Sequence, residues 1–147
     1  MVRARLLALV LTLAAASCWP GRLTRVDGGD EGDLGPTEAF AGLAPCFTED
    51  LYLEGPAAIT FGGVVGRAYT PRCLTVHTGA IVTFTGTFAT HPLRASTRGA
   101  QPSPIPATSS GGSLSVTLAT RGYYPFYCGE HGDNSGSGMA GVIRVIP

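Results

Sequence analysis

Four residues in the second half of the chain have side chains that bind transition metals. Cys128, His131 and Met139 lie close together near its end, and His91 lies some way upstream. One thiolate, two imidazoles and one thioether are the ligand set of a blue-copper electron-transfer site, where the thiolate and imidazoles bind strongly and the thioether weakly. The chain has only three histidines, and Met139 is its only methionine apart from Met1. Because so few residues compete for these roles, the set predicts a copper site.

The segments around these side chains follow a specific pattern. The last of them, "GYYPFYCGEHGDNSGSGMAGVIRV", places Cys-x2-His and a methionine after an aromatic strand and before a final Val/Ile strand. Upstream are "YTPRCLTVHTGAIVTFTG" and "THPL". Together, from about Tyr69 to Ile146, these segments resemble the cupredoxin family, especially its small plastocyanin-like members. The resemblance implies a Greek-key β-sandwich, one mononuclear copper per chain and electron transfer as the task.

The same resemblance implies a role for each metal-binding side chain. His91, Cys128 and His131 correspond to the equatorial ligands, and Met139 corresponds to the axial ligand. Seven residues, 132–138, separate His131 from Met139, which is more than plastocyanin-like proteins usually have there. They are glycine, serine, asparagine and aspartate, which form turns readily. We therefore expect an enlarged loop before the axial ligand.

The residue after His91 also departs from the family. Relatives often have an asparagine there, whose backbone N–H donates a hydrogen bond to the ligand sulfur. This chain has Pro92, which has no N–H to donate. Because hydrogen bonds to the sulfur tune the redox potential, the potential of a relative does not transfer to this chain.

Short β-rich runs punctuated by glycine and proline follow Cys46, and this pattern is typical of an all-β sandwich or barrel. Segment 113–120 alternates cleanly, with its three aliphatic side chains on one face. The expected strands are Ala57–Val65, Leu74–Val76, Ala80–Gly86, Ser113–Thr120 and the closing "GVIRVI".

In the strand before the metal-binding loop, the alternation of side chains indicates which residues share a face. Side chains alternate across a strand, so Tyr124, Phe126 and Cys128 share one side, and Tyr123 and Tyr127 share the other. If Phe126 faces the core, Cys128 begins the loop pointing inward. A copper thiolate needs such a shielded position, because the surrounding shell controls solvent access and redox potential.

The first 18 residues have the pattern of a secretory signal peptide. Arg3 and Arg5 precede the apolar run Leu6–Ala14, and small residues follow it. Cys18 comes next, as at a bacterial lipoprotein cleavage site, so we expect lipidation there and anchoring to a membrane surface. The alternative is ordinary cleavage nearby, which leaves a free thiol or removes Cys18. We expect an exported protein, either periplasmic or lipid-anchored.

Residues 19–45 are expected to form a tether and residues 46–147 the copper-binding domain. The tether is rich in glycine and in acidic residues and has little apolar content, so it cannot bury enough surface to fold alone. From Cys46 onward the chain has six arginines and five acidic residues, and it has no lysine anywhere. A near-neutral domain without a basic run argues against nucleic acid as a partner.

The four cysteines divide by elimination. Cys128 is assigned to copper, and Cys18 to lipid or removal. Cys46 and Cys73 remain, and two such cysteines in an exported protein usually form a disulfide. A redox-active pair is the alternative, although the two lack C-x-x-C spacing.

The leading functional hypothesis is a monomeric electron carrier that meets its redox partner proteins transiently. A periplasmic copper chaperone or buffer is the main alternative, but such proteins tend to use Met- or His-rich tracts. A zinc domain would have only three good ligands, and a multicopper oxidase would need paired His-x-His motifs, which do not occur. Glu130 and Asp133 have no evident partner base or nucleophile, so no enzyme activity is expected. His77 is interpreted as an exposed turn histidine.

Overall fold

The computed structural model describes residue 40 and residues 42–147. The predicted signal peptide (1–18), the lipidation of Cys18 and residues 19–39 of the predicted tether lie outside the described residues. The described part contains nine β-strands and two short 3-10 turns, η1 (Glu49–Leu51) and η2 (Gly63–Val65), and it has no α-helix. No helix in this part is long and apolar enough to cross a membrane.

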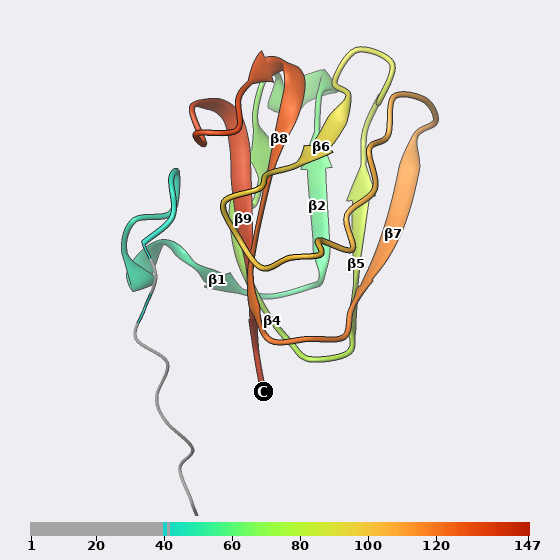
Figure 1. Ribbon diagram of the computed structural model, residues 1–147. Helices are drawn as coiled ribbons and strands as arrows, with labels where there is room; N and C mark the ends of the chain where they lie inside the picture. The colour runs from blue at the N-terminus through green and yellow to red at the C-terminus, as the bar shows by residue number, and fades with distance from the viewer. Residues whose placement is uncertain (1–39, 41) are drawn as a thin grey trace, which may run out of the picture. The chain divides into compact units, whose positions relative to one another are not determined.

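Two mixed sheets make up the fold (Figure 1). The five-stranded sheet runs in the order β1 (Leu53–Glu54), β4 (Cys73–His77), β9 (Gly138–Ile146), β8 (Gly122–Gly132) and β6 (Leu93–Ala95). The four-stranded sheet runs in the order β3 (Tyr69–Thr70), β2 (Ala58–Phe61), β5 (Ala80–Thr85) and β7 (Ser113–Leu118). The pairs β1–β4, β4–β9 and β2–β5 are parallel, because the chain crosses repeatedly from one sheet to the other. The predicted Greek-key β-sandwich is confirmed.

The main hydrophobic core lies between the sheets and takes side chains from both. Phe84 of β5 meets Phe126 of β8 edge to face, with ring centroids 5.1 Å apart. In β7, Val116 and Leu118 are buried and Leu114 is half-buried, as the predicted alternation requires. These inward faces hold the sheets at a fixed separation, which gives the loops at their ends a rigid base.

The predicted strand over 57–65 is shorter in the structure. β2 ends at Phe61, and residues 62–66 form a turn that includes η2. Gly62, Gly63 and Gly66 have φ values of 70°, 54° and 68°. This left-handed region suits glycine and cannot continue a strand, so the glycines end β2 rather than merely interrupting it.

The outer face of the five-stranded sheet is covered by the segment before β1. A disulfide joins Cys46 to Cys73 with a Cα–Cα distance of 5.8 Å, which confirms the predicted pairing. A second hydrophobic cluster surrounds it and includes Phe40, Tyr52 and Val142. Consequently both faces of β9 are covered: Met139, Ile143 and Val145 pack in the main core, and Val142 packs in the second cluster.

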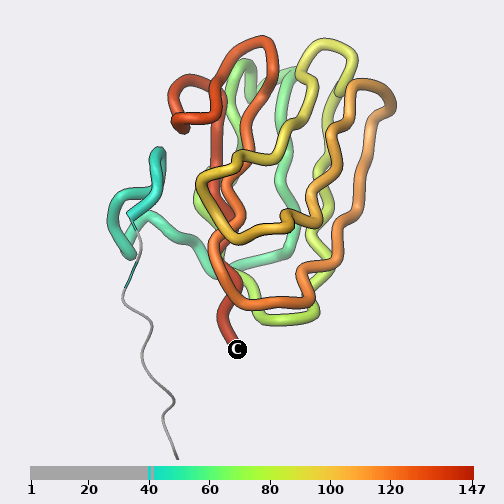
Figure 2. The backbone as a smooth tube through the Cα atoms, in the orientation of Figure 1, coloured from blue at the N-terminus to red at the C-terminus, as the bar shows by residue number. Residues whose placement is uncertain are grey.

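Three loops gather at one end of the sandwich, and the C-terminus lies at the other (Figure 1, Figure 2). They are the turn after β2, the loop between β5 and β6, and the hairpin between β8 and β9. Of the predicted metal ligands, His91 lies in the loop between β5 and β6, whereas Cys128, His131 and Met139 lie at the ends of β8 and β9 that the hairpin joins. The topology therefore brings together segments that are about 40 residues apart in sequence.

Candidate metal centre

β8 places Cys128 inside the sandwich. Tyr124 and Phe126 are buried, Tyr123 and Tyr127 are half-buried, and Cys128 is fully buried as a free cysteine. This is the predicted alternation, with Cys128 in phase with Phe126. Because the thiol is buried in the core between the sheets, the fold shields it from water.

A bulge in β8 brings the side chain of His131 close to that of Cys128. The β8–β9 ladder is regular up to Tyr127, which pairs with Ala140, and it resumes where Gly132 pairs with Gly138. The four residues 128–131 therefore lie opposite the single residue Met139. Such an irregularity re-aims side chains, so the side chain of His131 comes close to the buried Cys128. Cys128 Sγ lies 3.5 Å from His131 Nδ1.

His91 reaches the site from the loop between β5 and β6. The His91 amide donates to the Thr87 carbonyl at 3.1 Å, which closes a turn anchored by the fully buried Phe88. Immediately afterwards β6 pairs with β8, and Leu93 lies opposite Cys128. The pairing fixes the register between the loop of His91 and the strand of Cys128.

Pro92 contributes to the same connection. Its carbonyl accepts a hydrogen bond from the Gly129 amide at 2.7 Å, so the residues directly after His91 and Cys128 are bonded to each other. The proline cannot donate an N–H to the sulfur, but its carbonyl ties the two ligand segments together. Both ligands are therefore held by backbone rather than by side-chain contacts alone.

The three donor atoms form a compact triangle. His91 Nδ1 lies 3.1 Å from His131 Nδ1 and 3.9 Å from Cys128 Sγ, and the third side is the 3.5 Å contact. A point equidistant from the three atoms would be about 2 Å from each, close to the ~2.0–2.3 Å of metal bonds to His nitrogen and Cys sulfur. The predicted residues His91, Cys128 and His131 therefore form a group that fits one transition-metal ion.

The charges around His91 favour the neutral imidazole that a metal binds. Burial lowers the pKa of His91 below its ordinary value, and His131 and Arg67 lower it further because they disfavour a second positive charge. The two imidazole rings lie 4.9 Å apart. Since a metal binds the neutral imidazole, this environment keeps His91 in its binding form near neutral pH.

Met139 lies in the core beside the group. It is fully buried in the same hydrophobic cluster as Cys128, and it is the β9 residue opposite the bulge. The expected seven-residue loop is tighter than the sequence suggests, because Gly132 and Gly138 belong to the paired strands and the turn is 133–137. Met139 thus returns to the side of β8 that carries the ligands. Its role as axial ligand stays a prediction.

Asp133 holds the hairpin turn. Its carboxylate accepts hydrogen bonds from the Ser135 amide at 2.8 Å and the Ser137 amide at 3.2 Å. The hydrogen bond from the Ser135 hydroxyl lowers the pKa of Asp133 most, and the bonds from the two amides lower it further. Asn134 bonds to Thr97 in the segment after β6. The turn therefore has its own framework, and Asp133 has a structural use there.

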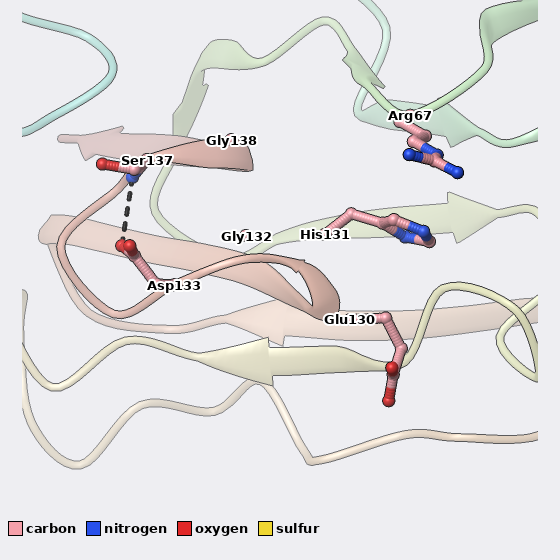
Figure 3. Close-up of a pocket in the computed structure, with 7 residues that line it drawn as sticks. All are labelled: Arg67, Glu130, His131, Gly132, Asp133, Ser137 and Gly138. Carbon is pink, nitrogen blue, oxygen red and sulfur yellow. Dashed lines mark hydrogen bonds between the residues drawn. The ribbon is translucent and has the colours of Figure 1, made fainter.

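His131 lines an open pocket of about 440 Å³ at the surface. Its ring lies between Arg67 and Glu130 in the close-up (Figure 3). His131 is half-exposed, whereas Cys128 is fully buried. One imidazole of the group thus connects the buried thiol to the surface. Arg67 belongs to no motif, so its place at the site was not predicted.

Two further residues at the site carry no sequence signal. Gly62 has φ 70° and ψ −170°, and a Cβ built there would lie 3.2 Å from His91 Cδ2. The hydroxyl of Tyr69 is buried without a hydrogen-bond partner among the described residues. Burial and the nearby Cys128 raise the pKa of Tyr69, so it stays protonated.

His77 lies away from the site, where its Nδ1 contacts the Pro147 carbonyl.

Comparisons with known proteins give matches in structure only. No family model matches, and no curated protein matches. The structure matches a copper-containing nitrite reductase from Thermus scotoductus SA-01 with 18% identity and a TM-score of 0.49, covering 71% of this chain and 29% of that one. It also matches a purple cupredoxin from Nitrosopumilus maritimus with 20% identity and a TM-score of 0.41, covering 60% of this chain and 98% of that one.

A plastocyanin from Dryopteris crassirhizoma also matches, with 24% identity and a TM-score of 0.40, covering 60% of this chain and 99% of that one. The matched structures thus include cupredoxins, the family that the sequence resembles. This chain spans less than a third of the nitrite reductase. The TM-scores are below 0.5, so functional conclusions rest on the geometry of the site itself.

Proposed function

We propose that the chain is a mononuclear type 1 copper protein that carries single electrons between redox partners. The observation that supports this most directly is the triangle of His91 Nδ1, His131 Nδ1 and Cys128 Sγ around a point about 2 Å from each. One thiolate and two imidazoles suit copper better than a harder ion. Bound copper would supply a reversible one-electron couple.

The protein's part in this chemistry is to hold the ligands still and keep water away. Cys128 is fixed by the β8 ladder and is fully buried. The bond from the Gly129 amide to the Pro92 carbonyl fixes His91 relative to it. Ligands held by two paired strands cannot rearrange greatly when the charge of the metal changes. A small rearrangement favours fast electron transfer.

Met139 completes the proposed site as a weak axial ligand. Its burial beside Cys128 and its place opposite the β8 bulge support this role. A weak axial thioether tunes the potential of such a site rather than holding the metal. The chemistry of the donor set thus assigns strong binding to three residues and tuning to the fourth.

The proposal includes a place and a partner. The leader and Cys18 support an exported protein, periplasmic or lipid-anchored at a membrane surface. Half-exposed His131 is the proposed route for electrons, and the hairpin 132–138 around it is the proposed docking surface for a transient redox partner. We propose a monomer that binds no nucleic acid and catalyses no reaction of its own.

A periplasmic copper chaperone or buffer is the second candidate. The fully buried thiol argues against it, because a protein that hands its metal over needs ligands that a receiver can reach. Among the described residues, His91, Cys128 and His131 are the one such group of potential ligands. The described domain therefore offers one three-residue group with a buried thiol rather than an exposed tract.

Redox cycling with a count of retained copper distinguishes the two candidates. The full chain is loaded with Cu(II), reduced with ascorbate, reoxidised, and passed over a desalting column with a Cu(I) chelator present. An electron carrier bleaches and recovers its colour over repeated cycles with its copper still bound. Transfer of the copper to the chelator in the reduced state would support the copper-handling candidate instead.

A further inference from the structure

The side chain of Arg72 brackets the backbone of Met139. Its Nη2 donates to the Gly138 carbonyl at 3.0 Å, and its Nε donates to the Ala140 carbonyl at 3.3 Å. These are the residues directly before and after Met139. The planar guanidinium has several donors in a fixed fork, which suits two acceptors at a set spacing.

The register of the sheet explains why this bracket exists. β4 pairs with β9 only from Cys73, which lies opposite Val142, so residues 138–141 extend beyond the end of β4. Alternate residues of a strand direct their carbonyls to the same edge, and those of Gly138 and Ala140 face the side where β4 has ended. Arg72 immediately precedes β4 and fills the place that a longer strand would occupy.

On its other edge, the segment 138–141 also lacks continuous pairing. β8 bulges away opposite Met139, so regular pairing stops at Ala140 and resumes only at Gly138. The backbone of Met139 therefore lacks a continuous strand neighbour on either side. The backbone of Arg72 is itself fixed, because its carbonyl accepts the Val142 amide at 2.8 Å and Cys73 is held by the disulfide.

We propose that Arg72 is a positioning residue for Met139, which sets the reach of the axial thioether and thereby the reduction potential. This inference rests on the proposed copper site. The thioether donates more to Cu(II) than to Cu(I), so a weaker axial contact raises the potential. Arg72 acts through the backbone of β9 and touches no ligand atom.

Substitution of Arg72 separates positioning from charge. In Arg72→Met the stem remains but both donors are lost, so the potential is expected to rise, by less than in Met139→Leu. Loss of a positive charge alone favours Cu(II) and lowers the potential. Arg67→Met is the matched charge control, because Arg67 lies near His131 and His91 but brackets no backbone. It should lower the potential.

Two further variants complete the voltammetry. Arg72→Lys keeps the charge but replaces the fork with a single donor group, so the potential should still rise, and this variant decides the test if Arg72→Met does not fold. In a Met139→Leu background Arg72→Met should no longer raise the potential. A fall in Arg72→Met at least as large as that in Arg67→Met, or an unchanged or lowered potential in Arg72→Lys, would overturn the inference.

A measurement without copper separates this inference from the proposed function. Amide hydrogen exchange of the full chain without added metal should be faster at residues 138–141 in Arg72→Met than in the wild type, because the bracket is lost. Equal exchange would contradict the positioning role whether or not the chain binds copper. If the wild type binds no copper but exchange changes as expected, only the proposed function has failed.

Discussion

At the scale of single residues, the site depends on three donor atoms with distinct roles. In the proposed copper site the Cys128 thiolate would supply the charge-transfer colour, and the two imidazoles complete the triangle of donor atoms. His91 is held by a turn and has a lowered pKa, whereas His131 faces the surface pocket. Substitutions of the three residues should therefore give different results.

Removal of either the thiolate or an imidazole tests the ligand assignment. Cys128→Ser should abolish the intense visible band, because only the thiolate supplies it. His91→Gly should lose the parent spectrum and regain it when imidazole is added to fill the open position. His77→Gly is the control. His77 is the last residue of β4, beside the C-terminus and away from the donor triangle, so this variant should keep the parent spectrum. A parent spectrum in Cys128→Ser or in His91→Gly without imidazole would exclude that residue as a ligand.

Met139 should tune the site without being required for copper. Met139→Leu removes the donor, so it should keep copper and colour and raise the reduction potential. Met139→Gln introduces an amide oxygen, a harder donor that favours Cu(II), and should lower it. Voltammetry of the pair therefore gives shifts of opposite sign. Potentials that match the wild type in both would identify Met139 as a packing residue only.

Gly62 should matter to His91 beyond its own backbone conformation. Gly62→Ala and Gly66→Ala both place a side chain at a φ near 70°, and each should cost about 1–3 kcal/mol of unfolding free energy. Only the Cβ at position 62 meets His91, while that at 66 meets nothing within 4 Å. Denaturation should show similar losses, and only Gly62→Ala should alter the copper spectrum. An altered spectrum in both would mean that general strain is the cause.

Residue types predicted the group of donor residues but not the residues that support it. A chain with three histidines and one internal methionine leaves few choices for a copper set, so His91, Cys128 and His131 could be named from the sequence. Arg67 and Gly62 were missed because nothing in their own neighbourhood has metal-site spacing. Their roles come from the fold, which brings the turn after β2 against His91.

At the scale of elements, two features place the donor residues. They are the alternation of side chains along a strand and the register between paired strands. The alternation in β8 predicted that Cys128 points inward, and burial confirms it. The bulge opposite Met139 could not be predicted, because a bulge depends on the partner strand. The loop 132–138 is shorter than expected for the same reason: its end glycines pair with each other across the hairpin.

The disulfide between Cys46 and Cys73 ties the segment before β1 to the start of β4. Its loop spans 27 residues, so replacing both cysteines with alanine should lower the free energy of unfolding by about 3–4 kcal/mol in the chain-entropy model. Chemical denaturation of the double variant measures this. Because neither cysteine belongs to the donor triangle, the copper spectrum should remain. Unchanged stability would mean that the second hydrophobic cluster holds the segment without the bond.

At the scale of the whole molecule, the described domain is a β-sandwich that carries one group of potential metal ligands at one end. The sandwich was predictable, because short alternating runs between glycines and prolines are typical of such folds. The assignment of strands to sheets was not, since β4 and β5 are neighbours in sequence yet lie in different sheets. The near-neutral charge of the domain gives no electrostatic basis for binding a polyanion.

Visible spectroscopy of the full chain, combined with a metal count, tests the central claim most directly. The chain is titrated with Cu(II) in the presence of an equal concentration of Zn(II), and bound metals are counted after desalting. The donor triangle predicts an intense thiolate-to-copper band that saturates at one copper per chain. A colourless protein that retains zinc, or copper bound without the band, would contradict it.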